Sequence, residues 1–274
     1  PTRDGIHGRE YINTSVDIGR KLNHLVFSGM ELQSDPLPGI ESPIPILFGI
    51  IPEHQQRGDV LASIVKAAES LGSFAIVRSK DMTNEYKQSK NVIPLIEKEG
   101  DVTEFPNAGM VIIPDSDDVL SVKEQIKAKH KEQIVTIRVQ ADQQAKDRIL
   151  KLVQDGAEVI DLYFDRHGRE YEASNPRHMR DVLRDVHTCL VKEGIRDEMT
   201  LIATSGIALA EHVTKAIICG ADLITIDIPL LIALECKLCE ECQRGEECQI
   251  KLEEVDVEYG SARIINLMHA WRNQ

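Results

Sequence analysis

The strongest constraint on the fold is a rhythm that begins near residue 44, in which short apolar runs alternate with longer stretches of helical periodicity. Continuously apolar runs are typical of strands buried on both faces, and helices between such strands cover a parallel sheet. The pattern predicts seven strands, at residues 44–51, 73–78, 109–114, 134–139, 158–164, 199–204 and 223–228. An eighth strand can lie within residues 79–105, where Lys, Asn and Gly interrupt the pattern.

Hydrophobic residues recur at helical spacing between these strands. Predicted helices cover residues 57–71, 92–98, 119–130, 142–155, 178–194 and 209–220, with further helical material from residue 229 and again at 261–271. Such a series fits a doubly wound open sheet or a closed (β/α)8 barrel. The chain after residue 43 approaches the ~250 residues typical of the barrel. We therefore expect an α/β fold of the TIM-type barrel class.

The two ends of the chain depart from this rhythm. Residues 1–43 show little periodicity and contain several turn residues, so they are expected to form an extended lead-in packed on the barrel. Residues 44–274 then form the barrel. Within it, Glu and Cys dominate a loop at residues 235–250, which we expect to project from the barrel.

Charge and hydropathy narrow the range of partners. The formal net charge of -13 argues against a nucleic-acid or anionic-membrane surface, because phosphates would be repelled over most of the molecule. No apolar run approaches the ~18 residues of a membrane helix, and no signal pattern opens the chain. We expect a cytoplasmic protein without membrane insertion, whose partners are proteins.

The loop at 235–250 carries four of the six cysteines, Cys236, Cys239, Cys242 and Cys248, in a C-x2-C-x2-C-x5-C spacing. Two-residue gaps let three thiolates converge, and the longer gap lets the fourth close the cage of an iron–sulfur cluster, 4Fe–4S rather than 3Fe–4S. Zinc is the main rival, although its sites usually come as two separated C-x2-C pairs. Four unrelated thiols are the third interpretation, but the polar residues between them argue against burial as hydrophobes.

Several segments resemble the FMN-binding domain of the glutamate synthases. The run GADLITIDIPLLIALEC at 220–236 is similar to the end of that flavin barrel, and the cysteines that follow resemble the cluster ligands of the archaeal-type enzymes. The run ATSGIALAEHV at 203–213 is similar to the family's phosphate loop and helix, and residues 25–27 and 44–46 resemble its lead-in and first strand. The resemblance implies a divergent member of this family.

The resemblance also implies where a flavin or another anion would bind. The flavin phosphate in such barrels lies at the ends of the last two strands, here Ser205 and Gly206, and Asp227 and Ile228. Ser205 and Asp227 replace family glycines, and a carboxylate facing a phosphate is repulsive. Arg138 stands where the family has a lysine over the flavin, and it cannot donate a proton near neutral pH.

Two further loops depart from the family pattern. Residues 165–171 replace a glycine-rich loop and retain only Gly168, while residues 51–54 replace a turn of small residues. His167 is either a base or a solvated loop residue, and Arg166 and Arg169 can join Arg138 in a different anion site. No catalytic residue can be assigned from the sequence.

These observations predict an iron–sulfur electron-transfer or structural subunit of a larger redox complex, derived from the glutamate synthase flavin domain. The alternative is an active FMN- and ferredoxin-dependent oxidoreductase of the glutamate synthase type. A third interpretation is a zinc-stabilised barrel that binds a partner protein. The expected partners are other redox protein subunits or ferredoxin, in a hetero-oligomer.

Overall fold

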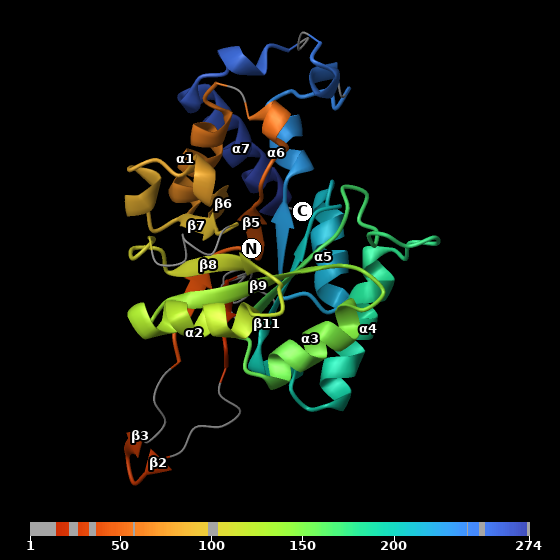
Figure 1. Ribbon diagram of the computed structural model, residues 1–274. Helices are drawn as coiled ribbons and strands as arrows, with labels where there is room; N and C mark the ends of the chain where they lie inside the picture. Colours follow the sequence, from red (N-terminus) through yellow and green to blue (C-terminus); the bar gives the residue numbers. More distant parts are fainter. Residues whose placement is uncertain are drawn as a thin grey trace, which may run out of the picture.

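The computed structural model describes residues 15–21, 27–32, 37–56, 58–97, 104–239, 241–246 and 250–272, and its centre is a closed barrel of eight parallel strands (Figure 1). The strands are β5 (Ile46–Phe48), β6 (Ala75–Arg78), β7 (Val92–Leu95), β8 (Met110–Pro114), β9 (Ile134–Gln140), β10 (Val159–Tyr163), β11 (Thr200–Thr204) and β12 (Leu223–Ile226). They follow one another round the barrel in chain order, and β12 pairs with β5 to close it. The TIM-type barrel expected from the sequence is confirmed.

Alternate residues of the strands enter two separate apolar clusters. The barrel interior gathers one set of strand residues, namely Leu47, Ile76, Ile93, Ile112, Ile134, Ile202 and Leu223. The residues between them pack outward with the helices in the second cluster, as Phe48, Val77 and Val111 do. Burial on both faces explains why the strands read as continuous apolar runs.

One predicted element was wrong. The segment 92–98, predicted as a helix, contains strand β7, and all four β7 residues are buried. The strand pairs with β6 on one side and with β8 on the other, so sheet burial overrides any helical tendency of this short run. It is also the eighth strand that the sequence located within residues 79–105. In the described part, β6 and β7 are joined by two 3-10 turns, η3 (Ser79–Asp81) and η4 (Tyr86–Gln88).

The predicted helices are otherwise present and surround the barrel. They are α1 (Val60–Leu71), α2 (Val119–Lys129), α3 (Ala145–Gln154), α4 (Met179–Lys192), α5 (Ala210–Ile218), α6 (Ile228–Ala233) and α7 (Val257–Arg272). Helix α7 packs on α1 and closes the ring. A side chain at Gly260 would collide with Ser63, so a glycine is needed at this crossing. Lys66 and Glu258 form an ion pair across the same contact. No helix in the described ranges is long and apolar enough to cross a membrane.

The described part of the lead-in lies at the amino-terminal end of the barrel. Strands β1 (Val16–Gly19) and β4 (Gly39–Ser42) pair antiparallel, and β2 (Phe27–Ser28) pairs with β3 (Glu31–Leu32). Ile18 enters the interior cluster, while the Gly19 N–H donates to Thr200 Oγ1 over 3.1 Å. Strand β1 thus covers the end of the barrel opposite the carboxyl ends of its strands. The domain boundary at residue 43 stays a prediction, and residues 1–14, 22–26 and 33–36 lie outside the described residues.

Candidate functional site

A polar network lies inside the barrel near the carboxyl ends of β9, β10 and β11. Arg138 Nε donates to Asp161 Oδ2 over 2.7 Å, and the Thr204 hydroxyl donates to Asp161 Oδ1. The Asp161 side chain is only 1% exposed and that of Arg138 14%, so the ion pair is almost entirely removed from water. Since each carboxylate oxygen has a donor, Asp161 is satisfied and fixes the orientation of the guanidinium.

Arg138 also borders a cavity of about 470 Å3 at the mouth of the barrel. The guanidinium carbon lies 5.8 Å from the centre of the Tyr163 ring, and the Tyr163 hydroxyl donates to Gln140 Oε1 over 2.9 Å. Burial raises the pKa of Tyr163, which keeps its hydroxyl protonated. Arg148 also lines the cavity, where its Nε donates to Asp115 Oδ2 over 2.8 Å, and this hydrogen bond raises the pKa of Arg148. The cavity is thus lined by two arginines, each paired with a carboxylate, and by further acidic side chains, and the anion site beside Arg138 stays a prediction.

The predicted phosphate end lies at β11 and β12, where two side chains contact each other. The Ser205 hydroxyl donates to Asp227 Oδ2 over 2.6 Å, and the Ile228 N–H donates to Asp227 Oδ1 over 2.7 Å. Burial raises the pKa of Asp227, although both donors act in the opposite direction. The carboxylate therefore caps the first turn of α6 and accepts the donors that an external anion would need there.

Gly206 and Gly168 are retained for close packing of two loops. Both have left-handed backbones, with φ of 74° and 69°. A Cβ on Gly206 would lie 2.5 Å from the Gly168 backbone nitrogen, so the loops after β10 and β11 touch through their backbones. This contact explains why Gly168 alone survives in the altered loop at 165–171.

The altered loop itself is a surface turn. Asp165 Oδ1 accepts the backbone N–H groups of His167 and Arg169, both over 2.8 Å, and Arg166 Nε donates to His167 Nε2 over 3.2 Å. The side chains of Arg166, His167 and Arg169 are exposed and do not line the cavity beside Arg138. The structure thus brings Arg138 together with Asp161 rather than with the two loop arginines.

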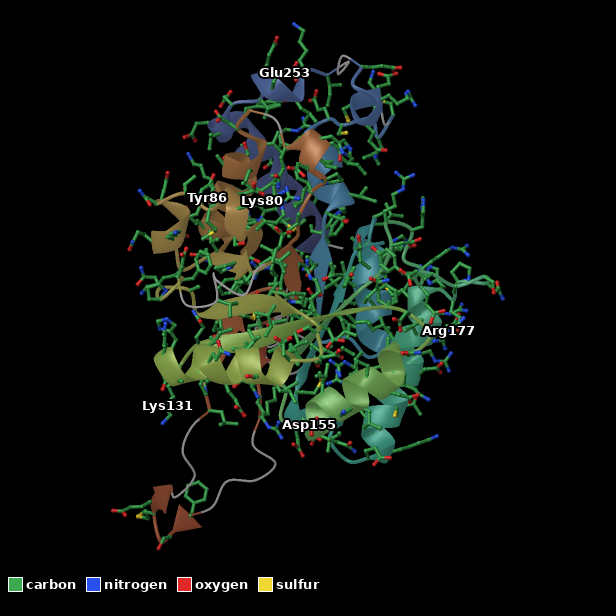
Figure 2. The ribbon with its side chains drawn as sticks, in the orientation of Figure 1. Lys80, Tyr86, Lys131, Asp155, Arg177 and Glu253 are labelled. Atoms are coloured by element: carbon green, nitrogen blue, oxygen red, sulfur yellow. The ribbon has the colours of Figure 1, made fainter. Side chains whose placement is uncertain are left out.

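The same loop is fastened to α4 farther along. Arg177, labelled in Figure 2, donates to Glu170 Oε1 over 2.9 Å and to Asp185 Oδ2 over 2.6 Å. The hydrogen bonds from Arg177 lower the pKa of Glu170, which stays ionised. The loop therefore has a fixed conformation despite its exposed tip.

The cysteine segment begins directly after α6. The Cys236 N–H donates to Leu231 O over 2.9 Å, and its half-buried side chain packs against the core. Gln55 Nε2 donates to Cys236 Sγ over 3.7 Å. Cys239 is exposed and Cys242 is partly buried in η7 (Glu241–Arg244), which packs against η2 (Glu53–Gln55). Figure 2 shows Glu253, farther along this part of the chain, at the end of the molecule opposite Asp155.

The predicted metal site is only partly described. Cys248 lies outside the described residues. The five cysteines that the structure describes are thiols, and no group of three or more His, Cys, Asp or Glu among the described residues is arranged to hold a metal ion. Left-handed backbones at Glu235 and Leu238, with φ of 69° and 53°, turn the chain on either side of Cys236. The four-cysteine site stays a prediction.

Comparison with known proteins finds similarity to the glutamate synthases. Residues 173–274 match the conserved region in glutamate synthase. The chain is 34% identical over 92 residues to the archaeal glutamate synthase (NADPH) of Methanocaldococcus jannaschii, covering 31% of this chain and 18% of that protein. It is 28% identical over 160 residues to the archaeal-type enzyme of Dehalococcoides mccartyi, covering 53% and 31%. These matches support a divergent member of a glutamate synthase-related family.

This similarity agrees with the resemblance found in the sequence, but it covers only part of the chain. A third relative, the archaeal glutamate synthase (NADPH) of Archaeoglobus fulgidus, is 26% identical over 163 residues and covers 54% of this chain and 31% of its own length. The chain thus spans less than a third of the length of these relatives. The matched region at 173–274 contains Ser205, Asp227 and all four clustered cysteines, whereas Arg138 lies outside it.

Sequence reasoning missed three contacts of the candidate site. Asp161 stands alone as a charged residue in the apolar strand β10, and that interruption was a readable signal. Thr204 and Gln55 carry no comparable signal, because their roles depend on partners 43 and 181 residues away.

Proposed function

We propose that this chain is an iron–sulfur electron-transfer or structural subunit of a larger redox complex, derived from the glutamate synthase flavin domain. The observation that carries the proposal is the contact between Asp227 and Ser205 at the phosphate end of the barrel, close to a complete four-cysteine run. The residues at the flavin phosphate site differ from those of the family, whereas the four cysteines that would bind an iron–sulfur cluster are present. Electron transfer without flavin chemistry accounts for both.

The thiol segment fits an iron–sulfur cluster by its donor set. Cys236, Cys239, Cys242 and Cys248 would hold it, and the cluster would supply one-electron transfer. The left-handed residues Glu235 and Leu238 fold the chain tightly around the first thiol, as short gaps between ligands require. The Glu235 carboxylate accepts a hydrogen bond of 3.0 Å from the Tyr259 hydroxyl.

The barrel mouth does not fit FMN. A phosphate at the ends of β11 and β12 would face the Asp227 carboxylate, which already accepts the Ser205 hydroxyl and the Ile228 N–H. Two unit charges ~4 Å apart near a protein surface repel by about 4 kcal/mol, which corresponds to about a thousandfold loss of affinity. We therefore assign no flavin step to this chain, and the FMN-dependent alternative is disfavoured.

The remaining parts of the proposal concern the assembly. The partners would be other redox protein subunits or ferredoxin, in a cytoplasmic hetero-oligomer. The net charge of -13 favours a neutral or basic partner surface. The unit that docks onto these partners would consist of the lead-in at 1–43 and the barrel at 44–274. The barrel includes the cluster loop at 235–250.

Metal and flavin analysis of the anaerobically prepared full chain tests the proposal. We expect about four iron and about four acid-labile sulfide ions per chain, a paramagnetic signal on reduction, and no stoichiometric flavin. Cys239→Ser should lose most of the iron, whereas Cys189→Ser, a change in helix α4, should retain it.

Three outcomes would refute it. Flavin near one equivalent per chain would favour the active oxidoreductase, glutamate formation with reduced ferredoxin would establish that activity, and zinc without sulfide would favour the zinc-stabilised barrel.

A further inference from the structure

Gln55 lies where the loop after β5 meets the cysteine segment. Its side chain belongs to η2 and only 5% of the residue is exposed. The amide Nε2 donates to Cys236 Sγ over 3.7 Å, a distance suited to an N–H···S hydrogen bond. A buried amide donor is therefore directed at the first of the four predicted ligands.

The backbone and neighbouring side chains hold this amide in place. The Gln55 N–H donates to Pro52 O over 2.9 Å, which forms the turn of η2. The next residue, Gln56, accepts a hydrogen bond of 2.6 Å from Arg78, which also donates to Asp81 over 2.8 Å. The loop is thus fastened to the end of β6, so the amide is oriented by the barrel itself.

The same short helix supports a second part of the cysteine segment. Helix η2 packs against η7, which contains Cys242. Residues 51–54 of this loop are among those that depart from the family pattern. The altered loop therefore contacts the segment that carries the thiols.

We infer that Gln55 is a positioning residue that raises the reduction potential of a cluster bound at Cys236, through its N–H···S hydrogen bond. The inference rests on the proposed function. Hydrogen bonds to the sulfurs are one of the factors that set the potential of an iron–sulfur cluster. A donor at sulfur stabilises the more negative, reduced state, because a bond to an anionic acceptor strengthens as its charge grows. The surrounding glutamates act in the opposite direction.

Gln55→Met tests the inference, because methionine has a similar length and lacks the N–H donor. In a redox titration followed by electron paramagnetic resonance, the ratio of reduced to oxidised cluster at the parent's midpoint should fall about three- to tenfold. A tenfold fall corresponds to about 59 mV for a one-electron couple. Gln55→Leu should shift the ratio in the same direction. Gln88→Met changes an exposed glutamine on η4 and should leave the ratio unchanged.

A second measurement separates a direct hydrogen bond from a general loosening of the loop. Transfer of the reduced parent protein into D2O should replace an exchangeable-proton hyperfine coupling, and both Gln55 variants should lack that coupling. Iron and sulfide retained in the Gln55 variants with an unchanged ratio would overturn the inference and leave the proposed function intact. Absence of iron and sulfide from the parent protein would overturn both.

Discussion

Removal of one partner from the Arg138–Asp161 ion pair should destabilise the barrel more than removal of both. The two side chains lie on adjacent strands, are joined by a 2.7 Å hydrogen bond, and are 14% and 1% exposed. Desolvation makes an isolated charge at either position unfavourable, whereas a pair of apolar side chains of similar size leaves no charge to solvate. The prediction therefore concerns the coupling between the two residues.

The expected loss of stability differs between the two single variants, because the Arg138 side chain is more exposed than that of Asp161. Arg138→Met leaves Asp161 fully buried with the Thr204 hydroxyl as donor, and should lower the free energy of unfolding by about 3–5 kcal/mol. Asp161→Leu leaves a guanidinium that borders the mouth cavity and can be hydrated there, so its cost should be about 1–3 kcal/mol. The double variant should lie within about 2 kcal/mol of the parent protein.

Urea unfolding at pH 7, followed by far-ultraviolet circular dichroism and by the fluorescence of the single tryptophan, Trp271, measures all four proteins. Agreement of the two probes establishes one transition. Lys215→Met serves as a matched control, because the Lys215–Glu211 pair is 66% and 63% exposed and should contribute less than about 1 kcal/mol. The reasoning fails if Arg138→Met costs less than about 1 kcal/mol, or if the cost in the double variant equals the sum of the single costs.

Two further predictions concern the barrel rim and the ring of helices. Burial raises the pKa of Asp227 in the folded state, so the stability contributed by its protonated form is present below its unfolded pKa and is lost as pH rises through the folded pKa. Asp227→Asn should therefore gain stability relative to the parent between pH 4 and pH 7.5 in urea unfolding, and a constant difference would contradict this. Gly260→Ala should cost about 1–3 kcal/mol, because the added methyl meets Ser63 across the α1–α7 contact. Ser63→Gly should recover part of that loss, whereas the exposed Asn266→Ala on α7 should change stability by less than about 0.5 kcal/mol.

The fold could be predicted because most strands and helices of this chain show a clear hydrophobic periodicity in their own sequence. Strand β9 and helix α4 are long enough to display that period without help from their neighbours. Strand β7 is not, since it has four residues and contains Pro94. Its identity as a strand depends on pairing with β6 and β8, and a local window of the sequence does not contain those partners.

The candidate site was predictable where a residue departs from a family motif and less so where a contact is new. Ser205 and Asp227 stand out as replacements of glycine, but their hydrogen bond joins adjacent strands across 22 residues. Gln55 and Cys236 meet only because β5 closes the barrel beside β12. Contacts made by barrel closure require the strand order, which apolar periodicity alone does not supply.

The altered phosphate end and the cysteine segment are joined by a single short helix. Asp227 caps the amino terminus of α6, and Cys236 follows three residues after the carboxyl end of that helix. A side-chain cap contributes about 1 kcal/mol to a helix, a large share of what holds a six-residue helix together. The Asp227 carboxylate, which would oppose a phosphate, therefore also stabilises the helix that precedes Cys236. If the proposed function is correct, loss of the flavin site and support of the cysteine segment are linked changes, because Asp227 contributes to both.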